Sequence, residues 1–168
     1  MLTQERLKQL LSYDPETGLF VRLCGRGSSK AGSVVARRNR DGYCRIYIEG
    51  REYLCHRLAF LYMTGSLPSQ EVDHLNHVRD DNRWANLRQA SHKQNCKNKG
   101  RYANSSKIYP GVAWSERAKK WIATIWSDGK QTHIGTFTGP DEAILARKHA
   151  EKAHGFHINH AAMTTERR

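Results

Sequence analysis

The sequence lacks long apolar runs and paired cysteines. No window of its 168 residues is long and apolar enough to span a bilayer, and the start, Met1 to Arg6, has no apolar core like that of a secretory signal. The four cysteines contain no C-x-x-C pair, so a structural zinc site has no support. We therefore expect a soluble, cytoplasmic protein without a membrane partner.

Acidic residues are missing from two long stretches. Residues 17–40 and 82–115 contain no Asp or Glu but many Lys and Arg, and the chain carries a net charge of +12. One interpretation is a solvated basic face, but two such stretches favour contact with the phosphates of duplex DNA. The basic residues that we expect to contact DNA are Arg37, Arg38, Arg40, Arg83, Arg88, Lys93, Lys97 and Lys99.

Short elements are predicted in the first 70 residues. Glu49-Gly50 is typical of a two-residue hairpin turn, which would place Cys44 directly opposite Cys55. A reducing compartment favours these cysteines as packed thiols over a disulfide. The predicted elements are a helix over 2–11, a strand at 19–21, a loop or DNA-contacting arm over 26–42, strands over 43–48 and 51–56, and a helix over 58–63.

A strand–loop–strand–helix unit is predicted next. Strands are expected near 71–73 and 87–89, with a polar loop over 74–84 between them. Ser91 and Gln94 form a capping-box signature, which starts a helix at Ser91 that we expect to run to about Lys99. The polar run 101–108 is expected to be a linker.

Four side chains of this unit suit the hydrolysis of a phosphodiester. If the first strand ends at Asp73-His74 and the helix folds back, Asn95 would come over the same point. Asp73 and Asn95 offer the hard oxygen ligands that Mg²⁺ or Mn²⁺ prefers. His74 would take a proton from the attacking water, and Asn86 would fix the loop that orients His74 through hydrogen bonds to backbone.

The same segment resembles the HNH endonucleases of phages and mobile introns. The resemblance covers about residues 13–98, and the residues that carry it most specifically are Val72 to Asn76, Asp81 to Arg88, Gln94-Asn95 and Asn98. It implies a ββα-metal fold, a site that binds one Mg²⁺ or Mn²⁺ through Asp73 and Asn95, His74 as general base and Asn86 as a structural residue. It also implies a phage-encoded, homing-type enzyme that acts inside the host cell.

One position departs from that family. His77 stands where relatives commonly carry glycine. His77 and His92 are therefore alternative metal ligands, which we rank below Asn95 because His92 opens the helix, away from the face of that turn.

The C-terminal region is predicted to contain three strands and a helix. Strands are expected over 111–114, 120–127 and 132–137, with a hairpin turn at Asp128-Gly129. Gly139-Pro140-Asp141 opens a helix in which Ala143, Ala146, Ala150 and Ala153 lie near one face, suited to close packing on the sheet.

This region resembles the plant ethylene-response-factor (Apetala-type) DNA-binding domain from about Tyr109 to Asn159. The residues that carry the resemblance are Gly111-Val112, Lys120 to Ala123, Ile134 to Phe137, Glu142-Ala143, His154-Gly155 and Asn159. It implies a three-stranded antiparallel sheet whose free face lies in the major groove.

Strand alternation predicts the two faces of that sheet. The residues expected to pack on the helix are Val112, Trp114, Trp121, Ala123, Ile125, Ile134 and Phe137. The residues expected on the DNA-reading face are Ala113, Ser115, Lys120, Thr124, Trp126, Gln131 and His133. Plant relatives carry arginines at several reading positions, whereas this chain has Ala113, Ser115 and Gln131.

The sequence thus predicts an α+β fold. Its expected parts are an N-terminal helix and hairpin region over 1–70, a catalytic core over 71–100, a linker over 101–108, a DNA reader over 109–160 and a tail over 161–168. The predicted function is a metal-dependent endonuclease that acts on double-stranded DNA as a monomer and nicks one strand, with a dimer as the route to a double-strand break. The alternatives are a non-catalytic DNA-binding regulator and an RNA-binding protein.

Overall fold

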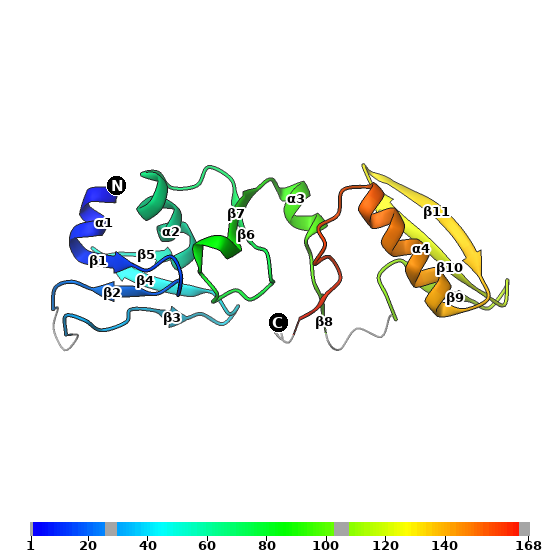
Figure 1. Ribbon diagram of the computed structural model, residues 1–168, viewed down its shortest axis with the longest axis horizontal. Coiled ribbons are helices and arrows are strands. Elements are labelled where there is room, and N and C mark those ends of the chain that lie inside the picture. Colours follow the sequence, from blue (N-terminus) through cyan, green and yellow to red (C-terminus); the bar gives the residue numbers. More distant parts are fainter. Residues whose placement is uncertain (1, 26–29, 103–107, 165–168) are drawn as a thin grey trace. The chain divides into compact units, whose positions relative to one another are not determined.

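The chain folds into two compact units. A computed structural model describes residues 2–25, 30–102 and 108–164, and divides the chain between Asn95 and Cys96 (Figure 1). The prediction of an α+β fold made of small antiparallel sheets and helices is confirmed. None of the helices among the described residues has the length and apolar character needed to cross a membrane.

The N-terminal unit begins with a helix that leads directly into a hairpin. Helix α1 (Gln4–Leu10) starts at Thr3, whose hydroxyl accepts a hydrogen bond from the amide of Arg6 at 3.2 Å. Strand β1 (Leu11–Tyr13) pairs antiparallel with β2 (Phe20–Arg22). Gly18 in the intervening turn has a φ of +73°, and a Cβ there would lie 2.4 Å from the backbone of Arg83. Only glycine therefore allows this turn to approach the 82–83 backbone so closely.

A three-stranded sheet follows, in the order β3-β4-β5. Strand β3 (Arg37–Arg38) lies on its edge, so the prediction of a loop over 26–42 is wrong at these two arginines; residues 26–29 lie outside the described residues. The turn at Glu49-Gly50 between β4 (Cys44–Ile48) and β5 (Arg51–Leu54) is confirmed, with Ile48 opposite Arg51. Cys44 and Cys55 are both free cysteines and form no disulfide.

Helix α2 (Cys55–Thr64) begins earlier than the sequence predicts. The second strand of the hairpin ends at Leu54, so His56 lies in the helix and not in the strand. The helix ends at Gly65, which takes the left-handed conformation. Its buried face carries Leu58, Ala59 and Leu61, because the helix covers the apolar side of the neighbouring strands.

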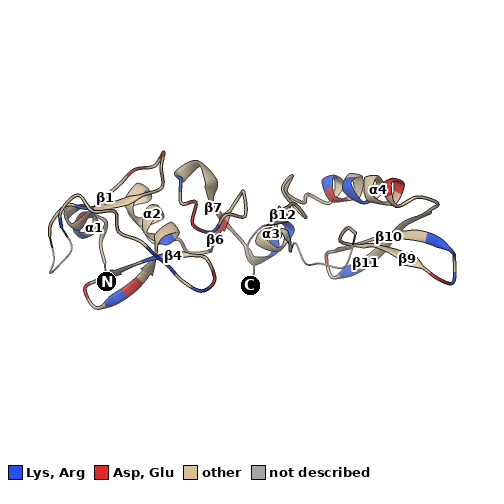
Figure 2. Ribbon diagram, turned by 90° about the horizontal axis from the view of Figure 1, so that it is seen from below, with Lys and Arg blue, Asp and Glu red and all other residues tan. Residues whose placement is uncertain are grey.

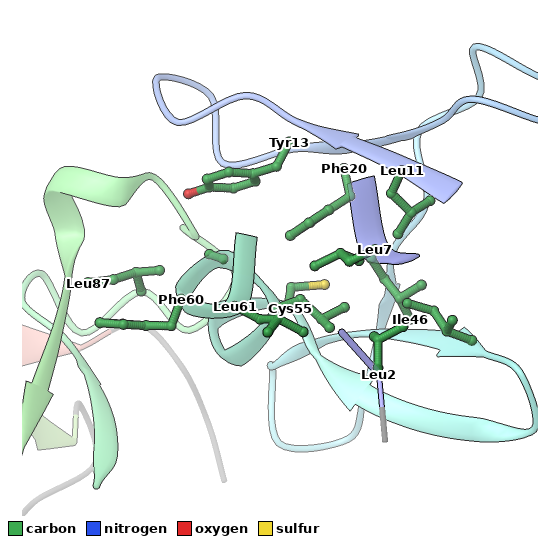
Figure 3. Packing of buried hydrophobic residues seen from close by; sticks show 13 residues of the cluster. Leu2, Leu7, Leu11, Tyr13, Phe20, Ile46, Cys55, Phe60, Leu61 and Leu87 are labelled. Carbon is green, nitrogen blue, oxygen red and sulfur yellow. The ribbon is translucent and has the colours of Figure 1, made fainter. Parts of the chain in front are cut away.

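The core of this unit joins α1, the β1–β2 hairpin, β4 and α2. Figure 3 shows Leu7, Phe20 and Leu61 meeting at its centre, and Leu7 is fully buried. Leu87, from the strand pair that follows, belongs to the same cluster. The elements that carry the candidate site are thus packed on the main core of the unit.

The predicted strand–loop–strand–helix unit is present. Strands β6 (Glu71–His74) and β7 (Leu87–Ala90) pair antiparallel, joined by a loop that ends in the short 3₁₀ helix η1 (Trp84–Asn86). Helix α3 (His92–Lys97) follows, two residues shorter at its end than predicted. The capping box is confirmed: the amide of Ser91 donates to Gln94 at 2.9 Å, and the amide of Gln94 donates to the Ser91 hydroxyl at 3.3 Å.

The C-terminal unit contains the predicted sheet and helix. Strand β10 (Lys120–Ser127) lies between β9 (Val112–Ser115) and β11 (Lys130–Phe137), and the turn at Asp128-Gly129 is confirmed. Strand β8 (Arg101–Tyr102) pairs parallel with β12 (Met163–Thr164), so the predicted linker begins as a strand. Residues 103–107 lie outside the described residues.

Helix α4 (Pro140–Ala153) buries only part of the predicted alanine face, with Ala146 and Ala150 half-buried. Ala143 is buried against the sheet, but Ala153 is exposed, and the buried positions continue along Arg147 and Glu151. The guanidinium of Arg147 lies 3.2 Å from the Glu151 carboxylate and also donates to the carbonyl of Pro110. This charged pair stands where the sequence predicts alanine packing, because positions i, i+4 and i+8 form one face of a helix.

The position of Trp114 also differs from the prediction. It was expected in the core, but 42% of it is exposed, and its ring lies 5.6 Å from that of Trp121 on the neighbouring strand. Its strand, β9, lies at the edge of the sheet. The other predicted core residues, including Val112, Ala123 and Ile125, are buried or partly buried.

Candidate active site

Asp73 lies directly opposite Arg88 across the β6–β7 pair. The carboxylate is buried, and its Oδ2 accepts hydrogen bonds from Arg88 Nε at 3.0 Å and from Arg88 Nη2 at 2.8 Å. The charge of the carboxylate is thereby compensated within the protein. Arg88, which was expected to contact DNA, is held in the site by this ion pair.

His74 is the last residue of β6 and is buried. Its Nε2 lies 3.5 Å from Oδ1 of Asn82, and its ring lies 5.1 Å from the ring of His56 and 5.9 Å from that of Tyr43. The strand ends here, which relaxes the alternation that would otherwise turn Asp73 and His74 to opposite faces.

His56 packs edge-on against His74 from helix α2. The planes of the two rings are 86° apart, and the buried Nδ1 of His56 has no hydrogen-bond partner among the described residues. Burial lowers the pKa of His56 to about 3, with further contributions from His74 and Arg57. Sequence reasoning assigned no role to His56, because only the tertiary fold brings it to His74.

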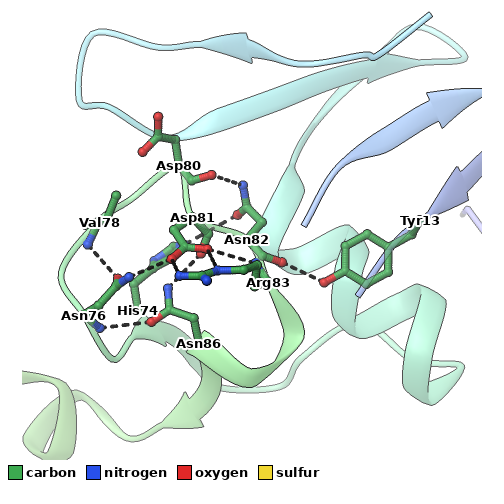
Figure 4. Close-up of polar contacts among 9 residues, drawn as sticks. All are labelled: Tyr13, His74, Asn76, Val78, Asp80, Asp81, Asn82, Arg83 and Asn86. Atoms are coloured by element: carbon green, nitrogen blue, oxygen red, sulfur yellow. Dashed lines mark hydrogen bonds and ion pairs between the residues drawn. The ribbon is translucent and has the colours of Figure 1, made fainter. Parts of the chain in front are cut away.

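Asn86 holds the loop that follows His74 (Figure 4). Its Oδ1 accepts from the amide of Asn76 at 3.0 Å, and its Nδ2 donates to the carbonyl of Asp81 at 2.8 Å. The carbonyl of Asn86 also accepts from the amide of Leu75 at 3.0 Å. One buried asparagine thus fixes both ends of the loop.

The loop is also anchored to the β1–β2 hairpin. The Tyr13 hydroxyl donates to the carbonyl of Asn82 at 2.7 Å, and the amide of Trp84 donates to the carbonyl of Pro15 at 2.9 Å. Burial, and after it the negative charges of Asp14 and Asp81, raise the pKa of Tyr13. The Tyr13 hydroxyl therefore stays protonated and remains a donor. Neither Tyr13 nor Asn82 was predicted as a site residue.

His77 adopts a left-handed backbone conformation, with a φ of 64°. Its amide donates to the carbonyl of His74 at 3.0 Å, which closes the turn directly after the candidate base. Glycine adopts this conformation without strain, which gives a physical reason for the glycine that relatives carry at this position.

A hydrogen bond between Asn95 and Glu71 connects helix α3 to strand β6. Asn95 Nδ2 donates to Glu71 Oε2 at 2.6 Å, and His92 Nδ1 lies 2.9 Å from Glu71 Oε1. The hydrogen bond from Asn95, and after it the one from His92, lower the pKa of Glu71. Glu71 and Asp73 are two positions apart on one strand, so both point to the same face. Glu71 is a site residue that sequence reasoning missed.

An open hollow of about 460 Å³ borders this cluster. Glu71 and His92 line it, together with Arg57, Ser69, Gln70, Ala90 and Ser91. Glu71 and His92 are both exposed, so the cluster around Asn95 faces solvent, whereas Asp73 and His74 are buried.

The ligands predicted from the sequence, Asp73 and Asn95, are oxygen donors of the kind that a divalent cation prefers. Mg²⁺ is commonly held by one or two carboxylates, with water and substrate phosphate completing its shell. Asp73 supplies a carboxylate, and Asn95 supplies an amide oxygen whose partner nitrogen is already bonded to Glu71. Within the described parts of the chain, no group of three or more His, Cys, Asp or Glu side chains is arranged to hold a metal ion. This absence applies to Asp73 as well as to His77 and His92, so the ranking of these residues as ligands stays a prediction.

The predicted DNA-contacting residues fall into two groups. Some are engaged within the protein: Arg38 pairs with Asp80 at 2.9 Å, Arg83 pairs with Asp81, and Lys97 donates to the carbonyl of His154. The remaining predicted residues that are exposed are Arg37, Arg40, Lys93, Lys99, Lys120, Trp126, Gln131 and His133, while Thr124 is half-buried. Exposure does not exclude partners, since His133 Nε2 lies 3.3 Å from the Thr136 hydroxyl.

The comparisons with known proteins concern the segment that carries this geometry. Residues 53–97 match the HNH endonuclease family. The HNH segment is less than half of the chain, but it includes Asp73, His74, Asn86 and Asn95. The comparison with curated proteins found no match.

One solved structure is similar to the chain over a longer range. It is described as "DNA binding and cleavage by the HNH homing endonuclease I-HmuI", and the similarity covers 74% of this chain and 71% of that chain, at 22% identity and a TM-score of 0.41. Both values are low. We therefore base the proposal below on the residues of the site and on the match of the HNH segment.

Proposed function

We propose that this protein is a metal-dependent DNA endonuclease of the HNH type. One observation carries the proposal: a buried histidine, His74, ends a strand beside Asp73, in a loop locked by Asn86, within the segment that matches the HNH family. The basic composition of the chain suits a polyanionic substrate. Double-stranded DNA is the substrate that we propose.

His74 acts as the general base. The Asn82 amide nitrogen donates to the carbonyl of Asp80 at 3.0 Å, so its oxygen faces His74 Nε2. The imidazole tautomer with its hydrogen on Nε2 has its lone pair on Nδ1, where it takes the proton of the attacking water. The water oxygen bonds to phosphorus as the bond to the 3′-oxygen breaks. The leaving 3′-oxygen takes a proton from a solvent water and His74 releases its proton to solvent, which yields a 5′-phosphate and a 3′-hydroxyl.

Asp73 and Asn95 would hold one Mg²⁺ or Mn²⁺. When bound, the ion supplies positive charge that stabilises the phosphate and the leaving oxygen. Arg88 compensates the charge of the buried Asp73 and keeps its carboxylate in place. Glu71 orients the Asn95 amide through the hydrogen bond at 2.6 Å.

The C-terminal sheet binds DNA in this proposal. Strands β9, β10 and β11 cover α4 with one face, and the other face carries Lys120, Trp126, Gln131 and His133 at the surface. A sheet of this kind fits the major groove. The chain has one set of catalytic residues, so a monomer nicks one strand at a time.

A non-catalytic DNA-binding regulator is the second candidate. The ion pair of Asp73 with Arg88 and the hydrogen bond of Asn95 to Glu71 favour it, because both candidate ligands already have partners in the protein. The regulator would use the same basic surface but would leave DNA intact.

A supercoiled-plasmid assay with Mg²⁺ or Mn²⁺ separates the two candidates. We expect wild type to convert the plasmid to the nicked form, and His74→Ala to be slower by about 10²–10⁴-fold, the usual contribution of a general base. His149→Ala, which removes an exposed histidine of α4, is the matched control and should cleave like wild type. DNA binding without cleavage by wild type would support the regulator, and full activity of His74→Ala would exclude His74 as the base.

A further inference from the structure

The free face of the C-terminal sheet has a defined arrangement. Ile122 lies directly opposite Ala113, Thr124 opposite His133, and Trp126 opposite Gln131. The intervening residues Ala123 and Ile125 are buried toward α4. Because side chains alternate along a strand, the three cross-strand pairs lie together on the face that α4 does not cover.

An open hollow of about 310 Å³ lies on this face. Its lining includes the apolar side chains of Ala113 and Ile122, and also Gln131 and Thr124. The Thr124 hydroxyl donates to the carbonyl of Gly111 at 3.3 Å, so this polar group already has a partner within the protein. The wall of the hollow therefore offers apolar contact on one side and a carboxamide on another.

Gln131 is available to a ligand. It is exposed, and its amide has no hydrogen-bond partner among the residues that the structure describes. Across the strand pair stands Trp126, which is 64% exposed. A carboxamide offers one donor and one acceptor side by side, and an exposed tryptophan beside it offers a flat apolar surface.

The charge of this sheet suits DNA. Its three strands contain no Asp or Glu, and Lys120 and Lys130 stand next to its two turns. Figure 2 shows both basic and acidic residues at the turns of the sheet, where the chain carries Glu116 and Asp128. By strand alternation Lys120 lies on the free face, whereas Lys130, opposite Ser127, lies on the other face. A face without acids and with one lysine at its edge complements a groove that is bordered by phosphates.

We infer that this face recognises an A·T base pair in the major groove, with Gln131 on adenine and the thymine methyl group in the hollow beside Ala113 and Ile122. The inference rests on the proposed DNA-reading role of the sheet. Glutamine pairs in a bidentate manner with N6 and N7 of adenine, and apolar side chains contact the methyl group of thymine. The adenine N6 and N7 atoms and the thymine methyl group lie on the same edge of one A·T pair. In the same way, Gln131 and the apolar residues line one hollow.

A G·C pair fits the hollow less well. Guanine presents two acceptors, which are best met by Arg or Lys, and cytosine has no methyl group. No arginine occurs in the three strands of the sheet, and the two lysines stand at strand ends. The side chains of the hollow therefore favour A·T over G·C.

The test uses the full chain with His74→Ala, which binds without cutting. Selection from random duplexes should enrich a motif that contains an A·T pair at a fixed position. Deoxyuridine in place of that thymidine removes only the methyl group and should weaken binding about four-fold, the effect of one buried methyl-sized group. The further change Ile122→Ala should remove most of the sensitivity to deoxyuridine.

The Gln131→Ala change tests the adenine contact. It should reduce the preference for A·T at that position by about five- to 150-fold, the range of one bidentate base contact. Thr132→Ala is the matched control, because Thr132 is the exposed neighbour whose side chain points to the other face, and it should keep the preference.

Two results would overturn the inference in different ways. A motif that is enriched but insensitive both to deoxyuridine and to Gln131→Ala would leave the DNA reader standing and exclude this mode of recognition. Binding without any enriched motif would exclude sequence reading by the sheet altogether, and with it the inference. Cleavage by the wild-type chain is measured separately, so neither result depends on the nuclease activity.

Discussion

His56 shows how much one buried residue constrains the site. It is 5% exposed, its ring contacts those of His74 and Tyr43, and its Nδ1 has no hydrogen-bond partner among the described residues. A charged imidazole in this position would lose its hydration without gaining a partner. The fold therefore requires His56 to be neutral, next to the residue that we propose as the base.

Because of His56, the free energy of unfolding should decrease as the pH is lowered. The pKa of His56 is about 3 in the folded chain and about 6.5 when unfolded, so between these values the unfolded chain binds the proton and the folded chain does not. Stability is unaffected above pH 6.5 and is lost as the pH falls toward 3, by at most about 1.4 kcal/mol per pH unit. Urea unfolding of wild type and His56→Phe between pH 4 and 7 measures the effect.

The free energy of unfolding of His56→Phe should depend less steeply on pH than that of wild type, since phenylalanine fills the space without titrating. Carboxylates that also titrate in this range contribute equally to both proteins and cancel in the comparison. Equal slopes for wild type and His56→Phe would show that His56 is not buried in its neutral form.

At the scale of elements, the β6–β7 pair is stabilised by the ion pair between Asp73 and Arg88. The Asp73 side chain is 7% exposed and that of Arg88 is 32% exposed. The hydrogen bonds from Arg88 offset the cost of burying the carboxylate. The pair joins the strand that bears the proposed base to the strand that leads into α3.

Arg88→Ala should destabilise the protein by somewhat less than the about 3–5 kcal/mol typical of breaking a buried pair, because part of Arg88 is exposed. Mn²⁺ should raise the stability of this variant by more than it raises that of wild type, since the ion would replace the lost positive charge beside Asp73. Thermal unfolding with and without Mn²⁺ measures both effects.

Arg83→Ala is the matched control for that experiment. Arg83 also pairs with an aspartate, Asp81, but its side chain is 54% exposed, so its loss should cost no more than about 1 kcal/mol. Equal losses of stability in Arg83→Ala and Arg88→Ala would contradict a special role for the buried pair.

The elements that were predicted best from the sequence are those that depend on residues close together along the chain. The turns at Glu49-Gly50 and Asp128-Gly129 and the capping box of Ser91 with Gln94 each involve residues at most three positions apart. The backbone preferences of these residue types act locally and are visible in the sequence. Of these three, the capping box lies at the candidate site, because it starts helix α3, which carries Asn95.

The parts of the site that were missed depend on contacts between distant segments. Tyr13 reaches the loop at Asn82 across 69 positions, and Glu71 contacts Asn95 across 24 positions. The sequence placed His56 at the end of a strand, and its contact with His74 required helix α2 to begin at Cys55 and not after that strand. No local pattern encodes such contacts.

At the scale of the whole molecule, charge should govern the affinity for DNA. The net charge is +12, and basic residues occur in both compact units. Several of the arginines are already paired within the protein, so exposed residues such as Arg37, Arg40 and Lys120 are the better phosphate contacts. Each phosphate contact releases condensed counterions, which makes binding weaker at higher salt.

The slope of log K against log salt should decrease by about 0.9 for each phosphate contact that is removed. Lys120→Gln should thus lower both the slope and the affinity for all duplex sequences. Gln131→Ala should leave the slope unchanged, because glutamine carries no charge. Titrations of labelled duplex at several salt concentrations measure both values, and an unchanged slope in Lys120→Gln would exclude Lys120 as a phosphate contact.

The central claim is that Asp73 and Asn95 bind one divalent ion beside His74. The most direct test is a titration of the full chain with Mn²⁺, in which electron paramagnetic resonance measures the concentration of the free ion. We predict one bound ion per wild-type chain in the presence of duplex DNA, and binding at least about ten-fold weaker in Asp73→Ala and in Asn95→Ala. Asp41→Ala, which removes an exposed acid outside the site, should bind like wild type. Wild-type affinity for Mn²⁺ in both Asp73→Ala and Asn95→Ala would contradict the claim.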